Sequence, residues 1–155
     1  MHRISLQITF ILVLAVVSGL IFNSLGEQSL SLIYHPVQFK PGTHLSSKQV
    51  YQFYLEGRAV FLDTRYKEEF DTAHINHSIN ISYNLSLDEI FSLVKNIAKD
   101  QIIVVYCANS SCYSSRRMTG FLLSQDYKNV FIYLDGFDDW KVNNYPMAKT
   151  SPSRE

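Results

Sequence analysis

The run IIVVY at Ile102–Tyr106 limits the possible folds more than any other segment of the chain. An uninterrupted β-branched run is typical of a strand buried on both faces, whereas a half-exposed strand alternates apolar and polar residues. Strands buried on both faces occur mainly in parallel sheets that helices cover on each side. The run ends directly at Cys107, so we expect this cysteine at the carboxyl end of a buried strand.

Short strand and helix patterns alternate along the rest of the chain. Strands are expected at residues 59–62, 78–81 and 130–134, and helices at residues 46–57, 64–71, 86–99, 113–125 and 137–142. This alternation predicts an α/β fold with a mostly parallel sheet. Because ligands of open α/β sheets bind beyond the carboxyl ends of the strands, Cys107 would lie in the binding crevice.

The charge balance and the cysteine count exclude several classes of function. Lys plus Arg and Asp plus Glu number 14 each, so no overall field favours nucleic acid as a partner. The two cysteines, Cys107 and Cys112, are too few for a disulfide-stapled scaffold or a structural zinc site. His74 and His77 are not expected to bind a metal, because neither an assured helix nor an acidic partner fixes them. The 155 residues suffice for one core, and their sequence leaves the oligomeric state open.

The chain begins with the apolar segment ISLQITFILVLAVVSGLIF at Ile4–Phe22, which contains no charged residue and is long enough to span a bilayer. A secretory signal peptide is the competing interpretation, because a short, weakly basic region precedes the segment. Val17 and Gly19 could form its cleavage site, but apolar residues follow them, which favours a retained membrane anchor over residues 1–22. A buried core helix is a third possibility.

The flanking charges give this segment an orientation. Arg3 precedes it, and the next Lys or Arg is Lys40. The positive-inside rule therefore places the C-terminal domain on the extracytoplasmic, or periplasmic, side of a membrane. We expect a linker at residues 23–43, a domain at residues 44–147 and a polar tail at residues 148–155.

A loop of small polar residues follows Cys107 in the segment VVYCANSSCYSSRR. We expect its backbone amides and the positive end of the following helix to surround one point and to stabilise an anion there. Such surroundings lower the pKa of a cysteine below its usual value of about 8.5, which would make Cys107 a nucleophilic thiolate. The alternative is a buried cysteine that acts as a small hydrophobic residue.

Three motifs resemble those of the rhodanese-like domain family and occur in the family's order. They are FLDTRYKEEFDTAHINHSINI at Phe61–Ile81, the strand and cysteine at Val104–Cys107, and NVFIYLDGFDDWKVNNYP at Asn129–Pro146. The resemblance implies a five-stranded parallel sheet flanked by helices and a sulfurtransferase that needs no cofactor. Cys107 would take sulfur from a sulfane donor such as thiosulfate, hold it as a persulfide, and pass it to a thiol or cyanide.

The loop departs from the common rhodanese pattern. It is longer, Ser110 replaces a glycine, and Ser114 and Ser115 occupy the positions of the usual arginine and serine. Arg116 and Arg65 are therefore candidate anion-binding residues, although an ion pair that organises the loop is the favoured role of Arg65. The candidate active-site loop comprises Ala108, Asn109, Ser110, Ser111, Tyr113, Ser114 and Ser115.

The second cysteine adds a variation, because the form Cys-x4-Cys-x2-Ser resembles a rhodanese subgroup with two cysteines in the loop. In this variation the thiol of Cys112 attacks the Cys107 persulfide, releases sulfide and leaves a disulfide. Thiol exchange permits this step if the two sulfur atoms approach closely. Alternatively, Cys112 is a helix-cap or packing residue that never meets Cys107.

Other functions compete with sulfur transfer. A phosphatase or arsenate reductase of the same fold would show Cys-x5-Arg, whose arginine clamps the oxyanion, but Tyr113 occupies that position. A catalytically silent interaction module normally lacks the cysteine, which this chain retains. A thiol/disulfide redox function of Cys107 and Cys112 is also open.

Overall fold

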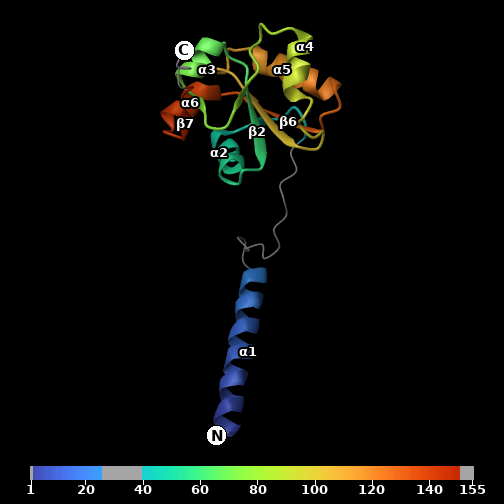
Figure 1. Cartoon of the computed structure of the whole chain (residues 1–155). Helices are drawn as coiled ribbons and strands as arrows, with labels where there is room; N and C mark the ends of the chain where they lie inside the picture. The colour runs from blue at the N-terminus through green and yellow to red at the C-terminus, as the bar shows by residue number, and fades with distance from the viewer. Residues whose placement is uncertain (1, 26–39, 151–155) are drawn as a thin grey trace. The chain divides into compact units, whose positions relative to one another are not determined.

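A computed structural model describes residues 2–25 and 40–150 of the chain (Figure 1). The chain divides into two compact units, Met1–Gln38 and Phe39–Glu155. The first unit contains helix α1 (His2–Leu25), and the second contains an α/β domain. Residues 26–39 of the expected linker and residues 151–155 of the expected tail lie outside the described residues.

Helix α1 contains the apolar segment that the sequence singles out. Among the described residues, Arg3–Ile21 form the one helix that is long and apolar enough to cross a bilayer. A secretory signal sequence near an N-terminus can also meet these criteria of length and composition. The membrane anchor and its orientation are therefore taken up below as proposals.

Strands and helices alternate through the α/β domain. The strands are β1 (His44–Leu45), β2 (Ala59–Asp63), β3 (His74–Ile75), β4 (Ile79–Asn80), β5 (Ile102–Tyr106), β6 (Asn129–Tyr133) and β7 (Met147–Ala148). The helices are α2 (Ser47–Leu55), α3 (Lys67–Thr72), α4 (Leu87–Val94), α5 (Ser114–Ser124) and α6 (Gly136–Val142). The expected α/β class is confirmed.

Five strands form one sheet in the order β1-β6-β5-β2-β4. Each neighbouring pair is parallel, and the buried run IIVVY is the central strand β5, between β2 and β6. Because all five strands run in one direction, their carboxyl ends meet at one edge of the sheet. Cys107 follows β5 directly and lies in the middle of that edge.

Helices cover both faces of the sheet, as the β-branched run predicts. Successive residues of β5 point to opposite faces. Val104 and Tyr106 join a core that includes residues of α2 and α6, whereas Ile103 and Val105 join a core that includes residues of α4 and α5. Figure 1 shows these two pairs of helices on opposite sides of the sheet.

Helix α4 begins where the sequence predicts and ends earlier. Ser86 Oγ accepts a hydrogen bond from the amide of Glu89 at 3.3 Å, and the Glu89 carboxylate accepts one from the Ser86 amide at 2.8 Å. This capping box fixes the first turn. The expected end near Lys99 is wrong, because the helix stops at Val94 and the Lys99 carbonyl accepts from the amide of Lys128 at 2.8 Å.

Strands β3 and β7, which the sequence pattern does not reveal, form a separate antiparallel pair. In this pair Ala148, expected in the polar tail, lies opposite His74. The amide of Thr150 also donates to the carbonyl of Asp71 at 3.1 Å. The chain after α6 therefore packs back beside α3.

Candidate active site

Hydrogen bonds hold the backbone on both sides of Cys107. The carbonyl of Tyr106 accepts from the amide and from the hydroxyl of Thr64, both at 2.9 Å. The carbonyl of Cys107 accepts from the amide of Phe137, in the first turn of α6, at 2.9 Å. These bonds connect the end of β5 to the end of β2 and to α6, so Cys107 leaves the sheet in a fixed direction.

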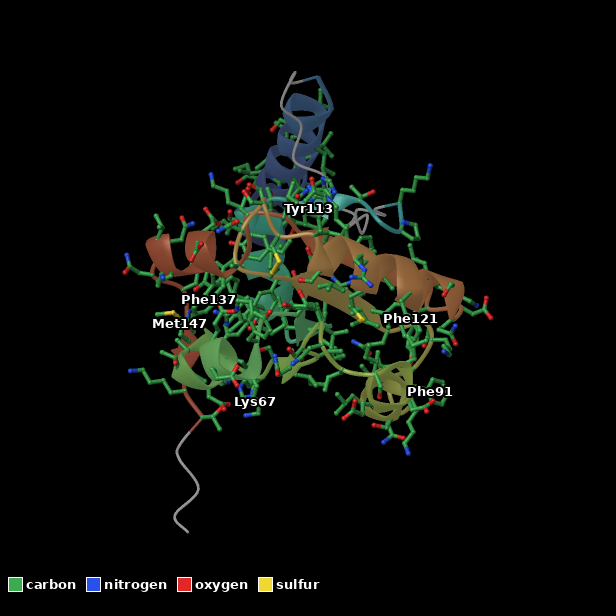
Figure 2. The ribbon with its side chains drawn as sticks, turned by 90° about the horizontal axis from the view of Figure 1, so that it is seen from above. Lys67, Phe91, Tyr113, Phe121, Phe137 and Met147 are labelled. Carbon is green, nitrogen blue, oxygen red and sulfur yellow. A yellow bond between two sulfur atoms is a disulfide. The ribbon has the colours of Figure 1, made fainter. Side chains whose placement is uncertain are left out.

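Cys107 forms a disulfide with Cys112, with the two Cα atoms 6.1 Å apart. Figure 2 shows this yellow bond between the labelled Tyr113 and Phe137. The two sulfur atoms therefore meet, and the alternative in which Cys112 never contacts Cys107 is wrong. Cys107 is 4% exposed, yet its sulfur is bonded to a half-buried loop residue instead of packing as a plain hydrophobic group. Reduction must precede any nucleophilic chemistry in this state.

The hydroxyl of Ser114 contacts both sulfur atoms. Its Oγ lies 3.2 Å from Cys107 Sγ, 3.1 Å from Cys112 Sγ and 2.7 Å from Thr64 Oγ1. The single hydroxyl proton of Thr64 is donated to Tyr106, so Thr64 Oγ1 can only accept from Ser114 while that bond persists. The Ser114 proton can therefore go to one of three acceptors, which are Thr64 Oγ1 and the two sulfur atoms. A thiolate or persulfide on Cys107 would attract it most, since hydrogen bonds to ionised acceptors are the stronger ones.

Two amides of the loop donate within the loop and not, as the sequence predicts, toward the Cys107 sulfur. The amide of Ser111 donates to the Asn109 side chain at 3.1 Å, and the amide of Cys112 donates to the Asn109 carbonyl at 3.1 Å. These two donors therefore serve the loop itself in the disulfide state and do not converge on Cys107 Sγ. Asn109 also donates to the Asp138 carboxylate at 2.9 Å, and the Ala108 carbonyl accepts from the Asp138 amide at 2.9 Å. The loop is thus tied to α6.

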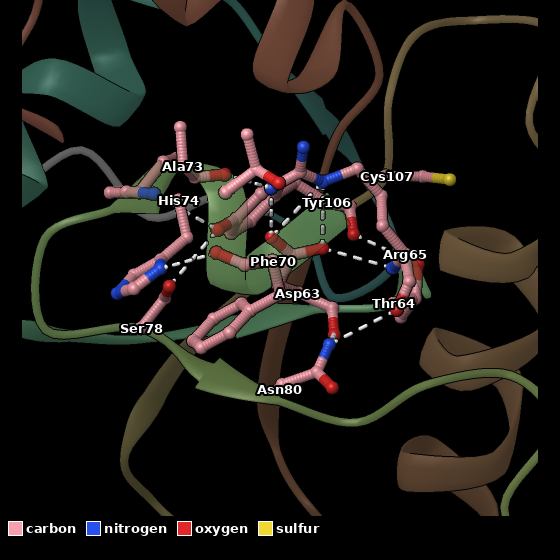
Figure 3. Close-up of polar contacts among 12 residues, drawn as sticks. Asp63, Thr64, Arg65, Phe70, Ala73, His74, Ser78, Asn80, Tyr106 and Cys107 are labelled. Atoms are coloured by element: carbon pink, nitrogen blue, oxygen red, sulfur yellow. Dashed lines mark hydrogen bonds and ion pairs between the residues drawn. The ribbon is translucent and has the colours of Figure 1, made fainter. Parts of the chain in front are cut away.

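Arg65 does not face the loop as an anion-binding residue. Its side chain is 5% exposed and pairs with the fully buried carboxylate of Asp63, with an Nη2 to Oδ2 distance of 2.6 Å (Figure 3). A further bond runs from Nη2 to the Ala73 carbonyl at 2.8 Å, and the guanidinium lies 4.0 Å from the ring centre of Phe137. The candidate role in anion binding is therefore wrong, and the ion pair that the sequence analysis favours is present.

The same buried network includes Tyr106, the last residue of β5. Burial alone would lower the pKa of Arg65, but the hydrogen bonds and charge of Asp63 outweigh it, so the pKa is raised. Burial, followed by the charge of Asp63, holds the pKa of Tyr106 well above its usual range. Tyr106 therefore stays a neutral phenol, whose oxygen accepts from the Ile75 amide at 3.2 Å and lies 3.0 Å from Ser78 Oγ.

Among the other candidate residues, Arg116 and Tyr113 lie on the outer side of the loop. Arg116 donates to the Ser110 carbonyl at 3.4 Å, and its guanidinium lies 5.5 Å from the ring centre of Tyr113, which is 73% exposed. Arg116 is therefore near the loop, but it is engaged by the loop backbone. Ser115 is buried in the first turn of α5.

Two residues of the site escape sequence reasoning. Thr64 holds the Ser114 hydroxyl by a hydrogen bond. In the sequence, a role for Thr64 is indicated only by its place between Asp63 and Arg65, at the end of the neighbouring strand. Asp138 holds the loop through Asn109, and it shows only as one acidic residue among several at the start of α6. Both depend on pairings between segments that are far apart in the chain.

Comparisons with known proteins support one family. Residues 46–143 match the family model of the rhodanese-like domain. Thiosulfate sulfurtransferase GlpE of Haemophilus influenzae is 30% identical over 113 residues, which cover 71% of this chain and 98% of that protein.

Solved structures share the fold. The rhodanese-like domain of an Anabaena protein has a TM-score of 0.58 at 20% identity, covering 76% of this chain and 85% of its own. A Bacillus halodurans protein has a TM-score of 0.60 at 19% identity, covering 70% and 78% respectively. At these identities the likeness shows the fold alone, and it confirms the expected five-stranded parallel sheet flanked by helices.

Proposed function

Because this chain belongs to the rhodanese-like domain family, we propose that it is a sulfurtransferase that carries sulfane sulfur on Cys107. The observation that carries the proposal is the place of Cys107 at the carboxyl end of the central parallel strand, with Ser114 Oγ 3.2 Å from its sulfur. The relative named thiosulfate sulfurtransferase supports the same class of reaction. The proposed reaction uses no cofactor.

In the first half-reaction, the reduced Cys107 thiolate attacks the sulfane sulfur of a donor such as thiosulfate. A bond forms between Cys107 Sγ and that sulfur, the sulfur–sulfur bond of the donor breaks, and sulfite leaves with its electron pair. Ser114 Oγ, which donates to Cys107 Sγ, would stabilise the persulfide by a charge-assisted hydrogen bond.

Two fates of the persulfide are possible. An external thiol or cyanide can attack its outer sulfur and carry it away, which returns the Cys107 thiolate. Alternatively, the Cys112 thiolate attacks Cys107 Sγ and expels hydrosulfide, so that the cysteine pair loses two electrons and the sulfane sulfur gains them. The product of this second route is the Cys107–Cys112 disulfide, and an external thiol reductant must reopen it.

The disulfide also favours a second candidate function. A thiol/disulfide oxidoreductase would cycle between the two states of Cys107 and Cys112 without any sulfane donor. The two candidate functions predict different results with thiosulfate. A sulfurtransferase in its reduced form releases sulfite from it, whereas a thiol/disulfide oxidoreductase does not.

The test of the proposed function is a single-turnover assay on the full chain, reduced and then freed of reductant. We expect a burst of sulfite from thiosulfate in the wild type and none in Cys107→Ser. Cys112→Ser should keep the burst and accumulate the Cys107 persulfide, seen by mass spectrometry as one added sulfur atom. The wild type should instead end as the disulfide with free sulfide.

Each other outcome contradicts a specific part of the proposal. A full burst in Cys107→Ser would mean that another group is the nucleophile. A wild type that oxidises and reduces its cysteine pair but never releases sulfite from any sulfane donor would be an oxidoreductase. A silent interaction module would show neither activity.

We also propose that α1 is a retained anchor that places the domain on the extracytoplasmic side. Its length and apolar composition, with Arg3 in its first turn and Lys40 as the next Lys or Arg, support this topology. The full-length chain should stay in the membrane pellet after an alkaline wash, and protease added outside intact cells or spheroplasts should digest the domain. A mature chain that begins after Gly19 would identify a cleaved signal peptide.

A further inference from the structure

A pocket of about 110 Å³ lies beside the cysteine pair. It is lined by Tyr83, Leu87, Ile90, Ser114, Arg117, Met118 and Phe121. These residues come from α4, α5 and the segment before α4, and the labelled Phe121 in Figure 2 marks the α5 side. Ser114 belongs both to the pocket and to the site, because its Oγ contacts both sulfur atoms. The pocket therefore ends one side chain away from the disulfide.

Apart from Ser114, the Tyr83 hydroxyl and one cation, the pocket is lined by apolar groups. Leu87 is 67% exposed and Tyr83 is 48% exposed, so a bound apolar group would cover surface that is now wet. The volume of about 110 Å³ is several times the roughly 10–15 Å³ that a single water needs on the same measure. A short hydrocarbon chain fits this space better than a small inorganic anion.

Arg117 supplies the charge at the pocket. It is exposed, and its guanidinium has no ion pair or side-chain hydrogen bond with another residue in the described part of the chain. Arg116, in contrast, is engaged by the Ser110 carbonyl. Among the acidic residues of α4, Glu89 is held by the Ser86 cap. Arg117 is thus available to an anionic group of a ligand.

We propose that this pocket binds an amphipathic thiol, a short hydrocarbon chain with a thiol at one end and a carboxylate at the other, which reopens the Cys107–Cys112 disulfide. The hydrocarbon would lie against Leu87, Met118 and Phe121, the carboxylate would meet Arg117, and the thiol would lie beside Ser114. The inference rests on the proposed function, in which the disulfide is an intermediate that needs a reductant.

The chemistry of reopening follows from the burial of the two cysteines, because Cys107 is buried and Cys112 is half-buried. The ligand thiolate attacks the sulfur of Cys112, the half-buried partner, and forms a mixed disulfide while Cys107 leaves as a thiolate. Ser114 Oγ can donate to this leaving thiolate. A second thiol then attacks the ligand sulfur of the mixed disulfide, which yields the oxidised ligand and the Cys112 thiolate. Cys107 is returned in its nucleophilic form.

The test measures the rate of disulfide reduction in the full-length oxidised protein, by quenching with a maleimide and counting labelled thiols. The probes are four thiols: the long carboxylate ω-mercaptohexanoate, its neutral analogue ω-mercaptohexanol, the long amine ω-aminohexanethiol and the short carboxylate mercaptoacetate. Each rate of reduction is divided by the concentration of the probe's thiolate form. We expect saturation with mercaptohexanoate, at a half-saturating concentration about threefold lower than that of the alcohol. Mercaptoacetate should react about tenfold more slowly at equal concentration, because it buries no hydrocarbon.

Substitution of Arg117 separates the charge from the apolar contact. Arg117→Gln should remove the preference for the carboxylate over the alcohol, and Arg117→Glu should reverse it in favour of the amine. Lys128→Gln is the control, because it removes an exposed positive charge that follows the opposite end of α5. It should leave the ratio of the rates with the carboxylate and the alcohol unchanged. A preference that survives Arg117→Glu, or equal rates with the long and short carboxylates, would overturn the inference.

A failure here is distinguishable from a failure of the proposed function. The burst of sulfite from the reduced protein needs no pocket thiol, so it reports on Cys107 alone. A normal burst without any thiol preference rejects the pocket ligand only. A clear preference without a burst rejects sulfur transfer and leaves the pocket as the site of a reductant.

Discussion

Replacing Arg65 by methionine is expected to lower the free energy of unfolding by about 3–5 kcal/mol, because it leaves a buried carboxylate without its partner. Asp63 is fully buried and accepts from the Arg65 amide, Nε and Nη2. The substitution also leaves the Ala73 carbonyl without the Nη2 donor. The measurement is guanidinium denaturation of the full chain in mild detergent, followed by the fluorescence of the fully buried Trp140.

Two further variants show whether the buried charge is the cause. The double variant Asp63→Leu with Arg65→Met removes both charges and should regain much of the loss, as replacement of buried ion pairs by apolar residues generally does. Lys67→Met breaks the exposed pair of Lys67 with Asp71 and should leave the unfolding midpoint unchanged. If Arg65→Met were no less stable than Lys67→Met, the ion pair would have no structural role.

The Arg65 network also supports the site. Its guanidinium lies 4.0 Å from the ring centre of Phe137, and the amide of Phe137 holds the Cys107 carbonyl at 2.9 Å. Asp63 in turn ends β2, next to Tyr106 in the register of β5. Arg65→Met should therefore slow the sulfite burst even without denaturant, when the variant is still folded.

The sheet and the place of Cys107 could be predicted because they follow from local patterns. The run IIVVY is typical of a strand buried on both faces, and the residue after such a strand lies at the edge where parallel strands end. The start of the helix at residue 86 is predicted as well, and the capping box of Ser86 and Glu89 that fixes it is also local. Each of these features is decided within a few residues.

The contacts within the site could not be predicted, because they join segments far apart in the chain. The path of the loop decides whether Cys112 meets Cys107, and five residues of spacing allow either result. The position of the Arg65 side chain depends on Asp63, Ala73 and Phe137 at once. The sequence therefore favours the ion pair but leaves an anion-binding role open. Beyond the end of α4, the Lys99 carbonyl likewise binds the amide of Lys128, a residue of another connection.

Gly136→Ala is expected to destabilise the domain and to displace the loop, because this glycine combines a left-handed backbone with a close backbone contact. Its φ is 67°, which costs a residue with a Cβ about 1–2 kcal/mol. A Cβ at this position would lie 2.5 Å from the Cys107 carbonyl oxygen and 2.7 Å from that of Ala108. These atoms are backbone, so relief requires a shift of the strand end, at a further cost of about 1–3 kcal/mol.

Gly57→Ala provides the matched control for the conformational part of this cost. Gly57 has a φ of 61° as well, but an added Cβ there would meet nothing within 4 Å. Chemical denaturation should therefore show a larger loss for Gly136→Ala, and the difference between the two variants measures the contact with the cysteine loop. Gly57→Ala should keep the sulfite burst, whereas Gly136→Ala should weaken it, since its Cβ pushes on the carbonyl of the nucleophile. Equal losses of stability together with an unchanged burst would show that the loop yields to the methyl group without moving Cys107.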